Sequence, residues 1–249
     1  AVTGNYATTS PDGNVTTAAD TVNVAADGQK SDALKSRLIA GETYTVSEIN
    51  IPAGYTKAED FSFTVNTDGT IAATAGSYDQ NQELLTINDT MTQFTIYKHH
   101  GEKPLENTQF TIASIDGSHF ADGSDQPMSV STGADGNYVI TGALVAGNSY
   151  RLTETKASGG YVTPLEADVQ FKVDGSGKRL EIDSTKNVLL ADLLAVQTGL
   201  SIHNEDVVLS VQKQDNLGQG LTGAGLALYR WDEEHSKKDG DAVKTWTST

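Results

Sequence analysis

The stretch LVAGNSYRLTE at residues 144–154 has a near copy earlier in the chain, LIAGETYTVSE at residues 38–48. The two segments align without a gap at an offset of 106 residues (144 − 38), and both continue to a Gly-Tyr pair, at 54–55 and at 160–161. Agreement over this length indicates that the chain contains more than one copy of the same domain.

A second set of matches has an offset of 115 residues (200 − 85). The segment LTIND at 85–89 matches LSIHN at 200–204, and FTIYK at 94–98 matches LSVQK at 209–213. The nine extra residues (115 − 106) predict an insertion, most simply in the leucine-rich stretch 188–194. We therefore expect a repeating unit of about 115 residues, which is a normal size for a β-sandwich domain.

These offsets divide the chain into three parts. We expect a complete domain at 93–207, an earlier copy at 1–92 that lacks its first strand, and the N-terminal part of a third copy at 208–249. Two interpretations of the incomplete copies stay open. The sequence is an excerpt of a longer tandem array, or residues 208–249 of one molecule complete the 1–92 unit of another by strand addition. The excerpt is the simpler interpretation, because tandem arrays continue past any cut.

Most of the chain shows the two-residue alternation of apolar and polar side chains that is typical of half-buried antiparallel strands. The clearest such segments are residues 61–65, 94–97, 110–112, 138–140, 169–173 and 207–211. Asp-Gly turns separate many of them. Helical spacing occurs only at 33–38 and 189–194, where we expect short helical turns. The pattern predicts an all-β fold of tandem Greek-key, immunoglobulin-like β-sandwiches.

The composition argues against several classes of function. The 249 residues include 33 acidic and 17 basic side chains, and the resulting formal net charge of −16 disfavours nucleic-acid binding. The absence of cysteine excludes disulfides and thiolate chemistry. The longest apolar stretch, 188–196, is too short to span a membrane. No phosphate loop, dinucleotide fingerprint or G-x-S-x-G motif is present, so we expect no cofactor and no enzymatic activity on a separate substrate.

The potential metal ligands are the histidines and one acidic loop, which is expected to be solvated. His119, His203 and His235 show no metal-ligand spacing and are also expected to be solvated. His99 and His100 are neighbours on a strand and point to opposite faces, so they cannot chelate one ion together. Asp116, Asp122 and Asp125 share one Gly/Ser-rich loop, but their spacing is not that of an EF-hand. We therefore expect no metal site.

Three polar residues of the middle domain have the same two-residue parity as its core. Each of Lys98, Glu154 and Asn204 follows two apolar residues at steps of two along its strand. Since alternate residues of a strand share one face, all three are expected to point into the core. A buried lysine, glutamate and asparagine are costly unless they satisfy one another. The alternative is an ordinary salt bridge between Glu154 and a Lys98 amine that reaches the surface.

The order of these motifs resembles the Cna protein B-type (CnaB) domain of Gram-positive surface proteins and sortase-assembled pili. In that family a strand-borne lysine is followed by an L-x-G-A-x-F-like strand, which is similar to LENTQF at 105–110 and closer to LTGAGL at 221–226. The family's Y-x-L-x-E-T segment is matched by YRLTET at 150–155, and its closing strand by LSIHN at 200–204. The resemblance covers nearly the whole chain.

The resemblance implies an intramolecular isopeptide bond between Lys98 and Asn204, with Glu154 as the catalytic residue. Burial lowers the pKa of a lysine and raises that of a carboxyl group, so a neutral, nucleophilic amine beside a protonated acid is the expected starting state. The acid would polarise the Asn204 amide and move a proton as ammonia leaves. Because the reaction occurs once per domain, it is maturation of the protein and not enzymatic turnover.

The flanking copies carry corresponding residues only in part. In the first copy Glu48 corresponds to the catalytic acid and Asp89 to the acceptor, with Asn88 as the alternative acceptor one residue away. In the last copy Lys213 corresponds to the lysine.

The predicted function is a structural stalk segment of a Gram-positive pilin or cell-wall-anchored adhesin, located outside the cell in the cell wall or pilus. The partners that the resemblance implies are sortase and neighbouring pilin or cell-wall components. The alternative is an adhesin module that binds a host protein or glycan through a sandwich face or the acidic loop. Exposed aromatic clusters would favour that alternative.

Overall fold

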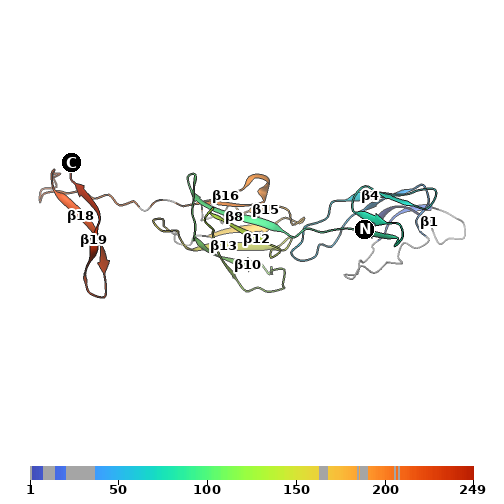
Figure 1. The fold of residues 1–249 in the computed structure, drawn as a ribbon, viewed down its shortest axis with the longest axis horizontal. Helices are drawn as coiled ribbons and strands as arrows, with labels where there is room; N and C mark the ends of the chain where they lie inside the picture. The colour runs from blue at the N-terminus through green and yellow to red at the C-terminus, as the bar shows by residue number, and fades with distance from the viewer. Residues whose placement is uncertain are drawn as a thin grey trace. The chain divides into compact units, whose positions relative to one another are not determined.

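A computed structural model describes residues 2–7, 15–20, 37–162, 168–183, 185, 190–204, 206 and 208–249 of the chain. The chain forms two compact units, residues 1–205 and 206–249. Within these described ranges the regular elements are β-strands and the short 3-10 turn η3, Ala195–Gln197 (Figure 1), which confirms the prediction of an all-β fold. The finer division of the chain at 92/93 and 207/208 stays a prediction.

The N-terminal part of the first unit contains one antiparallel five-stranded sheet and a hairpin. The sheet has the order β2-β1-β3-β4-β5, and β6 pairs with β7. The bounds of these strands are β1 (Val2–Ala7), β2 (Val15–Asp20), β3 (Thr43–Val46), β4 (Phe61–Val65), β5 (Ile71–Ala73), β6 (Ser77–Asp79) and β7 (Leu84–Thr86). A small core around Tyr44, Phe63 and Val65 covers one face of the sheet.

Two sheets form a sandwich in the middle of the chain. One has the order β11-β10-β13-β14-β15, and the other has the order β12-β8-β17-β16 with β9 added to β8. The bounds are β8 (Gln93–His100), β9 (Lys103–Pro104), β10 (Gln109–Ile115), β11 (Met128–Ser131), β12 (Asn137–Thr141), β13 (Ser149–Lys156), β14 (Asp168–Val173), β15 (Leu180–Ile182), β16 (Leu190–Leu193) and β17 (Gly199–His203).

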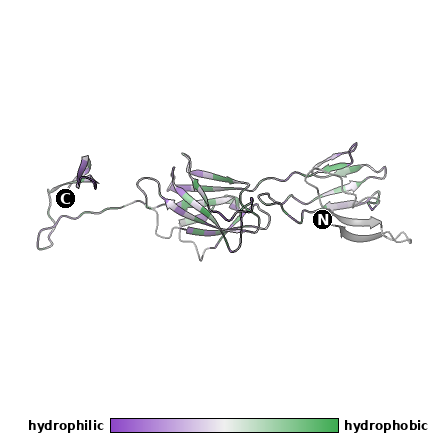
Figure 2. Cartoon of the chain, turned by 90° about the horizontal axis from the view of Figure 1, so that it is seen from below, coloured by the Kyte–Doolittle hydropathy of each residue, from purple (hydrophilic) through white to green (hydrophobic). Residues whose placement is uncertain are grey.

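Hydrophobic residues alternate with polar ones along these strands (Figure 2), and the hydrophobic set fills the space between the two sheets. On β8, for example, Phe94 and Ile96 are buried while Thr95 between them is not. Burial of such side chains contributes about 1.5–3 kcal/mol each and is the main force that holds the sheets together.

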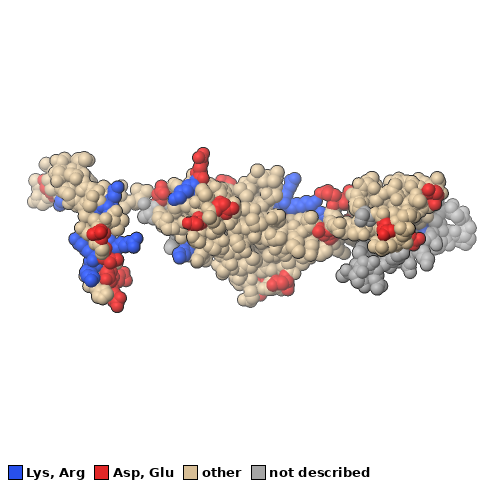
Figure 3. All heavy atoms as spheres, viewed as in Figure 1, with Lys and Arg blue, Asp and Glu red and all other residues tan. Residues whose placement is uncertain are grey.

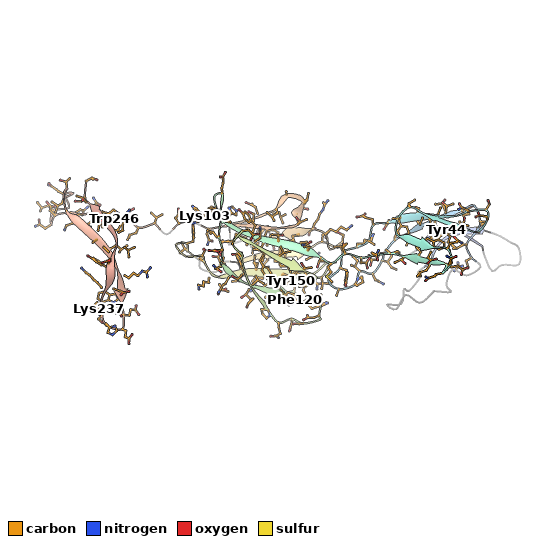
Figure 4. The ribbon with its side chains drawn as sticks, in the orientation of Figure 1. Tyr44, Lys103, Phe120, Tyr150, Lys237 and Trp246 are labelled. Carbon is orange, nitrogen blue, oxygen red and sulfur yellow. The ribbon has the colours of Figure 1, made fainter. Side chains whose placement is uncertain are left out.

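The predicted internal repeat has a structural counterpart. The Tyr44 hydroxyl accepts a hydrogen bond from the Ile39 main-chain N–H at 2.8 Å, and the Tyr150 hydroxyl accepts one from Val145 N–H at 2.9 Å. Both pairs are related by the offset of 106 residues. Tyr150 also packs on Phe120, with ring centroids 5.4 Å apart (Figure 4), so each tyrosine anchors the turn before its strand to the core.

One strand pair departs from the expected antiparallel order. β8 and β17 lie side by side in parallel, with Lys98 opposite Ile202 in the register. The first and last strands of the sandwich are therefore direct neighbours. This pairing brings together residues that are about 100 positions apart in the sequence.

The prediction of a helical turn at 189–194 is wrong. Leu190–Leu193 is the edge strand β16, which pairs with β17, and the 3-10 turn η3 (Ala195–Gln197) follows it. The backbone groups on the open side of β17 offer a ladder of hydrogen bonds, which outweighs the helical spacing of a short leucine run. Of the other expected turn at 33–38, residues 33–36 lie outside the described residues.

The second compact unit has a single described pair of strands, β18 (Gly225–Asp232) and β19 (Lys237–Thr247). Charged side chains of both signs gather on this ribbon (Figure 3). The strand expected at 207–211 is not formed. Residue 207 lies outside the described residues, and residues 208–211 are exposed and irregular. In the described part of this unit β18 and β19 pair with each other, and residues 208–211 pair with neither of them.

A short segment between β3 and β4 contacts the middle sandwich. The Thr92 N–H donates to the Gly54 carbonyl at 2.8 Å, and the Lys57 N–H donates to the Ser176 carbonyl at 2.7 Å. Main-chain hydrogen bonds of this kind fix the position of a connecting segment more firmly than exposed side chains do. The segment thus joins the N-terminal sheet to the sandwich.

Candidate functional site

Lys98, Glu154 and Asn204 lie together in the core of the middle sandwich, as their spacing predicts. Their exposed fractions are 0%, 3% and 2%. Buried lysine and glutamate are rare unless they are paired. The alternative in which the Lys98 amine reaches the surface is therefore wrong.

Three strands from both sheets position these side chains. Lys98 lies on β8, and Asn204 directly follows β17, the parallel neighbour of β8. Glu154 lies on β13 in the facing sheet. The same alternation that buries the apolar residues of each strand turns these polar groups inward.

The three side chains form a closed ring of contacts. The Lys98 Nζ contacts Asn204 Oδ1 and lies 2.9 Å from Glu154 Oε2. The Asn204 Nδ2 donates to Glu154 Oε1 at 3.1 Å. One carboxyl group therefore touches both the lysine nitrogen and the amide nitrogen of the asparagine.

Burial of Lys98 lowers its pKa, because an ammonium ion loses its hydration in the core. The hydrogen bond and charge of Glu154 act in the opposite direction but are the smaller effect. A lysine with a lowered pKa has a larger fraction of neutral, nucleophilic amine at neutral pH. The site thus holds a nucleophile, an amide and a carboxyl group in contact, away from water.

The structure does not bring the flanking candidates into a similar arrangement. Glu48 is half-buried and accepts a hydrogen bond from the Ala58 N–H at 2.8 Å, whereas Asp89 and Asn88 are exposed beyond the end of β7. Within the described residues, no hydrogen bond or ion pair joins Glu48 to Asp89. Lys213 is exposed in the second unit. Their roles in crosslinking stay predictions.

Three histidines beside the site form a contact that the sequence analysis missed. The His203 ring lies 5.5 Å from His99 and 5.3 Å from His100, and all three side chains are half-buried, whereas the sequence analysis predicts that His203 is solvated. The His100 Nδ1 lies 2.7 Å from the main-chain carbonyl oxygen of Asn204. The available signal was their position in the sequence, directly after Lys98 and directly before Asn204.

Over the described ranges, no three His, Asp or Glu side chains are placed to hold a common metal ion. No helix in the described part of the chain has the length and apolarity that a membrane span needs.

A family model described as SpaA: Prealbumin-like fold domain matches residues 5–79 and 92–187, which is more than half of the chain. No curated protein matches the sequence.

Similar solved structures include the C-terminal fragment of the pilus adhesin SpaC from Lactobacillus rhamnosus GG, at 16% identity and a TM-score of 0.39, covering 84% of this chain and 90% of that one. The Bacillus anthracis TIE protein has 16% identity and a TM-score of 0.39, covering 100% of this chain and 38% of that one. Domains D2 and D3 of the major pilin SpaD from Corynebacterium diphtheriae have 14% identity and a TM-score of 0.30, covering 66% and 57%.

Proposed function

The chain belongs to the family of SpaA prealbumin-like fold domains, and from this premise we propose that it is a stalk segment of a Gram-positive pilin or cell-wall-anchored adhesin. In this proposal the protein acts at the cell surface, with sortase and neighbouring pilin or cell-wall components as partners. An isopeptide bond between Lys98 and Asn204 stabilises its middle sandwich. The observation that carries the proposal is the closed ring of Lys98, Glu154 and Asn204 in the core.

The proposed reaction is an amide exchange within the folded chain. The neutral Lys98 amine attacks Cγ of Asn204, the bond from Nζ to Cγ forms, and the bond from Cγ to Nδ2 breaks to release ammonia. Nζ must lose a proton and Nδ2 must gain one, and the Glu154 carboxyl group touches both nitrogens. It is therefore placed to carry the proton from one to the other. Packing holds the reacting groups together, which is worth up to about 7–11 kcal/mol of the barrier.

The crosslink would serve a stalk because of where it lies in the sandwich. Tension along the chain enters the domain at β8 and leaves after β17, the two strands that the bond would join. Once Lys98 and Asn204 are linked, force passes directly from one to the other. The 106-position segment between them then carries no tension.

A force-extension measurement tests this role. The wild-type chain, pulled from its two ends, is expected to show no release of the segment between Lys98 and Asn204. A Lys98→Met variant fills the same space without the amine and should lengthen by roughly 350 Å more when its middle sandwich unfolds, at about 3.3 Å per residue. Equal extension of the two proteins would contradict the proposal.

The lowered pKa of Lys98 predicts how an uncrosslinked variant responds to pH. In Asn204→Ala the amine stays free, and its pKa lies below the usual 10.5 in the folded state. At pH values between the lowered pKa of the folded state and 10.5, the unfolded chain binds more protons than the folded chain. The free energy of unfolding of this variant therefore rises with pH in that range. In the crosslinked wild-type protein the Lys98 nitrogen is part of an amide, so it does not titrate.

Urea unfolding from about pH 7 to about pH 10 measures this difference. The wild-type protein should exceed Asn204→Ala in stability by an amount that shrinks as the pH rises. Titrating groups away from this site have the same surroundings in both proteins, so their contributions cancel in the comparison. A difference that stays constant with pH would mean that Lys98 is not a free buried amine in the variant.

A further inference from the structure

We propose that His100 is a positioning residue for the crosslink, because its side chain holds the main chain of Asn204 in register with Lys98. This inference rests on the proposed function of the site. It concerns the rate at which the bond forms.

Asn204 needs such support because it lies just past the last residue of β17. Two hydrogen bonds tie its main chain to β8. Its N–H donates to the His99 carbonyl at 3.1 Å, and its carbonyl oxygen lies 2.7 Å from His100 Nδ1. A carbonyl oxygen only accepts, so Nδ1 carries the proton of this bond. The first bond continues the strand ladder, whereas the second depends on the histidine side chain.

The His100 ring is itself held between two other elements. It lies 5.3 Å from the ring of His203 at the end of β17, and 5.2 Å from the ring of Tyr161. Tyr161 follows β13, the strand that carries Glu154. The amine of Lys103, a residue labelled in Figure 4, lies over the Tyr161 ring, 5.6 Å from its centroid. His100 thus lies on the strand of Lys98, contacts the residue before Asn204, and contacts the segment that follows the strand of Glu154.

Loss of the His100 bond would leave the Asn204 carbonyl without its side-chain donor at a strand end. A misplacement of about 1 Å at a reacting group can slow a reaction about 100-fold. We expect His100→Ala to form the crosslink about 10–100-fold more slowly than the wild-type protein. The final crosslinked product should be the same.

The matched pair His100→Asn and His100→Gln separates positioning from general stability. The Asn amide nitrogen takes the place of Nδ1, so this variant should recover most of the wild-type rate. The Gln amide is one bond longer and should remain slow. His119→Ala removes an exposed histidine from the same sandwich and should react at the wild-type rate.

The rates are measured on the full chain. Each protein is made by cell-free translation, quenched in acid at intervals and weighed by intact-mass spectrometry, with the fraction that has lost ammonia as the readout. Circular dichroism checks that each variant folds. If His100→Ala does not fold, the rates of His100→Asn and His100→Gln are compared instead.

The outcomes distinguish the two claims. Wild-type protein that keeps its full mass would overturn the crosslink, and this inference with it. Wild-type protein that loses ammonia at the same rate as His100→Ala or His100→Gln would overturn the role of His100 alone.

Discussion

Replacement of Glu154 by alanine is expected to leave the protein at the full mass calculated from its sequence, whereas the wild-type protein is lighter by one ammonia. The variant lacks the carboxyl group that contacts both Lys98 Nζ and Asn204 Nδ2. Without the crosslink, the unfolded chain regains the freedom of a 106-position loop. By analogy with a disulfide this lowers the free energy of unfolding by about 5 kcal/mol. The melting temperature should fall by roughly 20 °C.

Glu154→Gln is the matched control for this variant. Glutamine fills the space of the glutamate but cannot carry a proton between the two nitrogens, so we expect this protein to stay uncrosslinked as well. Its stability should lie slightly above that of Glu154→Ala, because no cavity is left in the core. If either variant loses ammonia at the wild-type rate, Glu154 is not the catalytic residue.

Gly54→Ala is expected to destabilise the 1–205 unit by about 3 kcal/mol. Gly54 has a φ of +82°, and a Cβ there would lie 2.3 Å from the Gly142 carbonyl oxygen and 2.9 Å from Ala121 Cβ. Both contacts belong to the middle sandwich, so the substitution pushes the β3–β4 segment away from it. For a stalk, this predicts a looser connection between the N-terminal sheet and the sandwich.

Gly160→Ala provides the control, because Gly160 is the equivalent residue of the Gly-Tyr pair in the second copy. It has a φ of +92°, but a Cβ there would meet nothing within 4 Å. Only the backbone strain of a positive φ remains, so Gly160→Ala should lower the free energy of unfolding by about 1 kcal/mol. Thermal unfolding of both variants measures the difference. Equal losses of stability would show that the contact with Gly142 and Ala121 does not matter.

The sequence was sufficient to predict the all-β fold and the burial of Lys98, Glu154 and Asn204. Both follow from local alternation, since a residue two positions from a buried side chain on the same strand faces the same side. The repeat added a second constraint, because it places Glu154 in the same motif as the buried tyrosine Tyr150.

The features that could not be predicted depend on neighbours that are distant in the sequence. The segment Leu190–Leu193 becomes a strand because β17 offers it an open edge. Residues 208–211 show a similar alternation but pair with no described strand, so they stay irregular. Asp89 is exposed because β7 ends at Thr86, three residues before it, so no strand turns its side chain inward. The contact between His100 and Asn204 joins two strand ends through a parallel pairing, which no local pattern reveals.

Peptide mapping of the wild-type protein by mass spectrometry is the most direct test of the central claim, which is a covalent bond between Lys98 and Asn204. The account predicts one branched peptide that contains both residues and is lighter by one ammonia than the sum of its two linear parts. Recovery of the Lys98 and Asn204 peptides as separate linear species at full mass would contradict it.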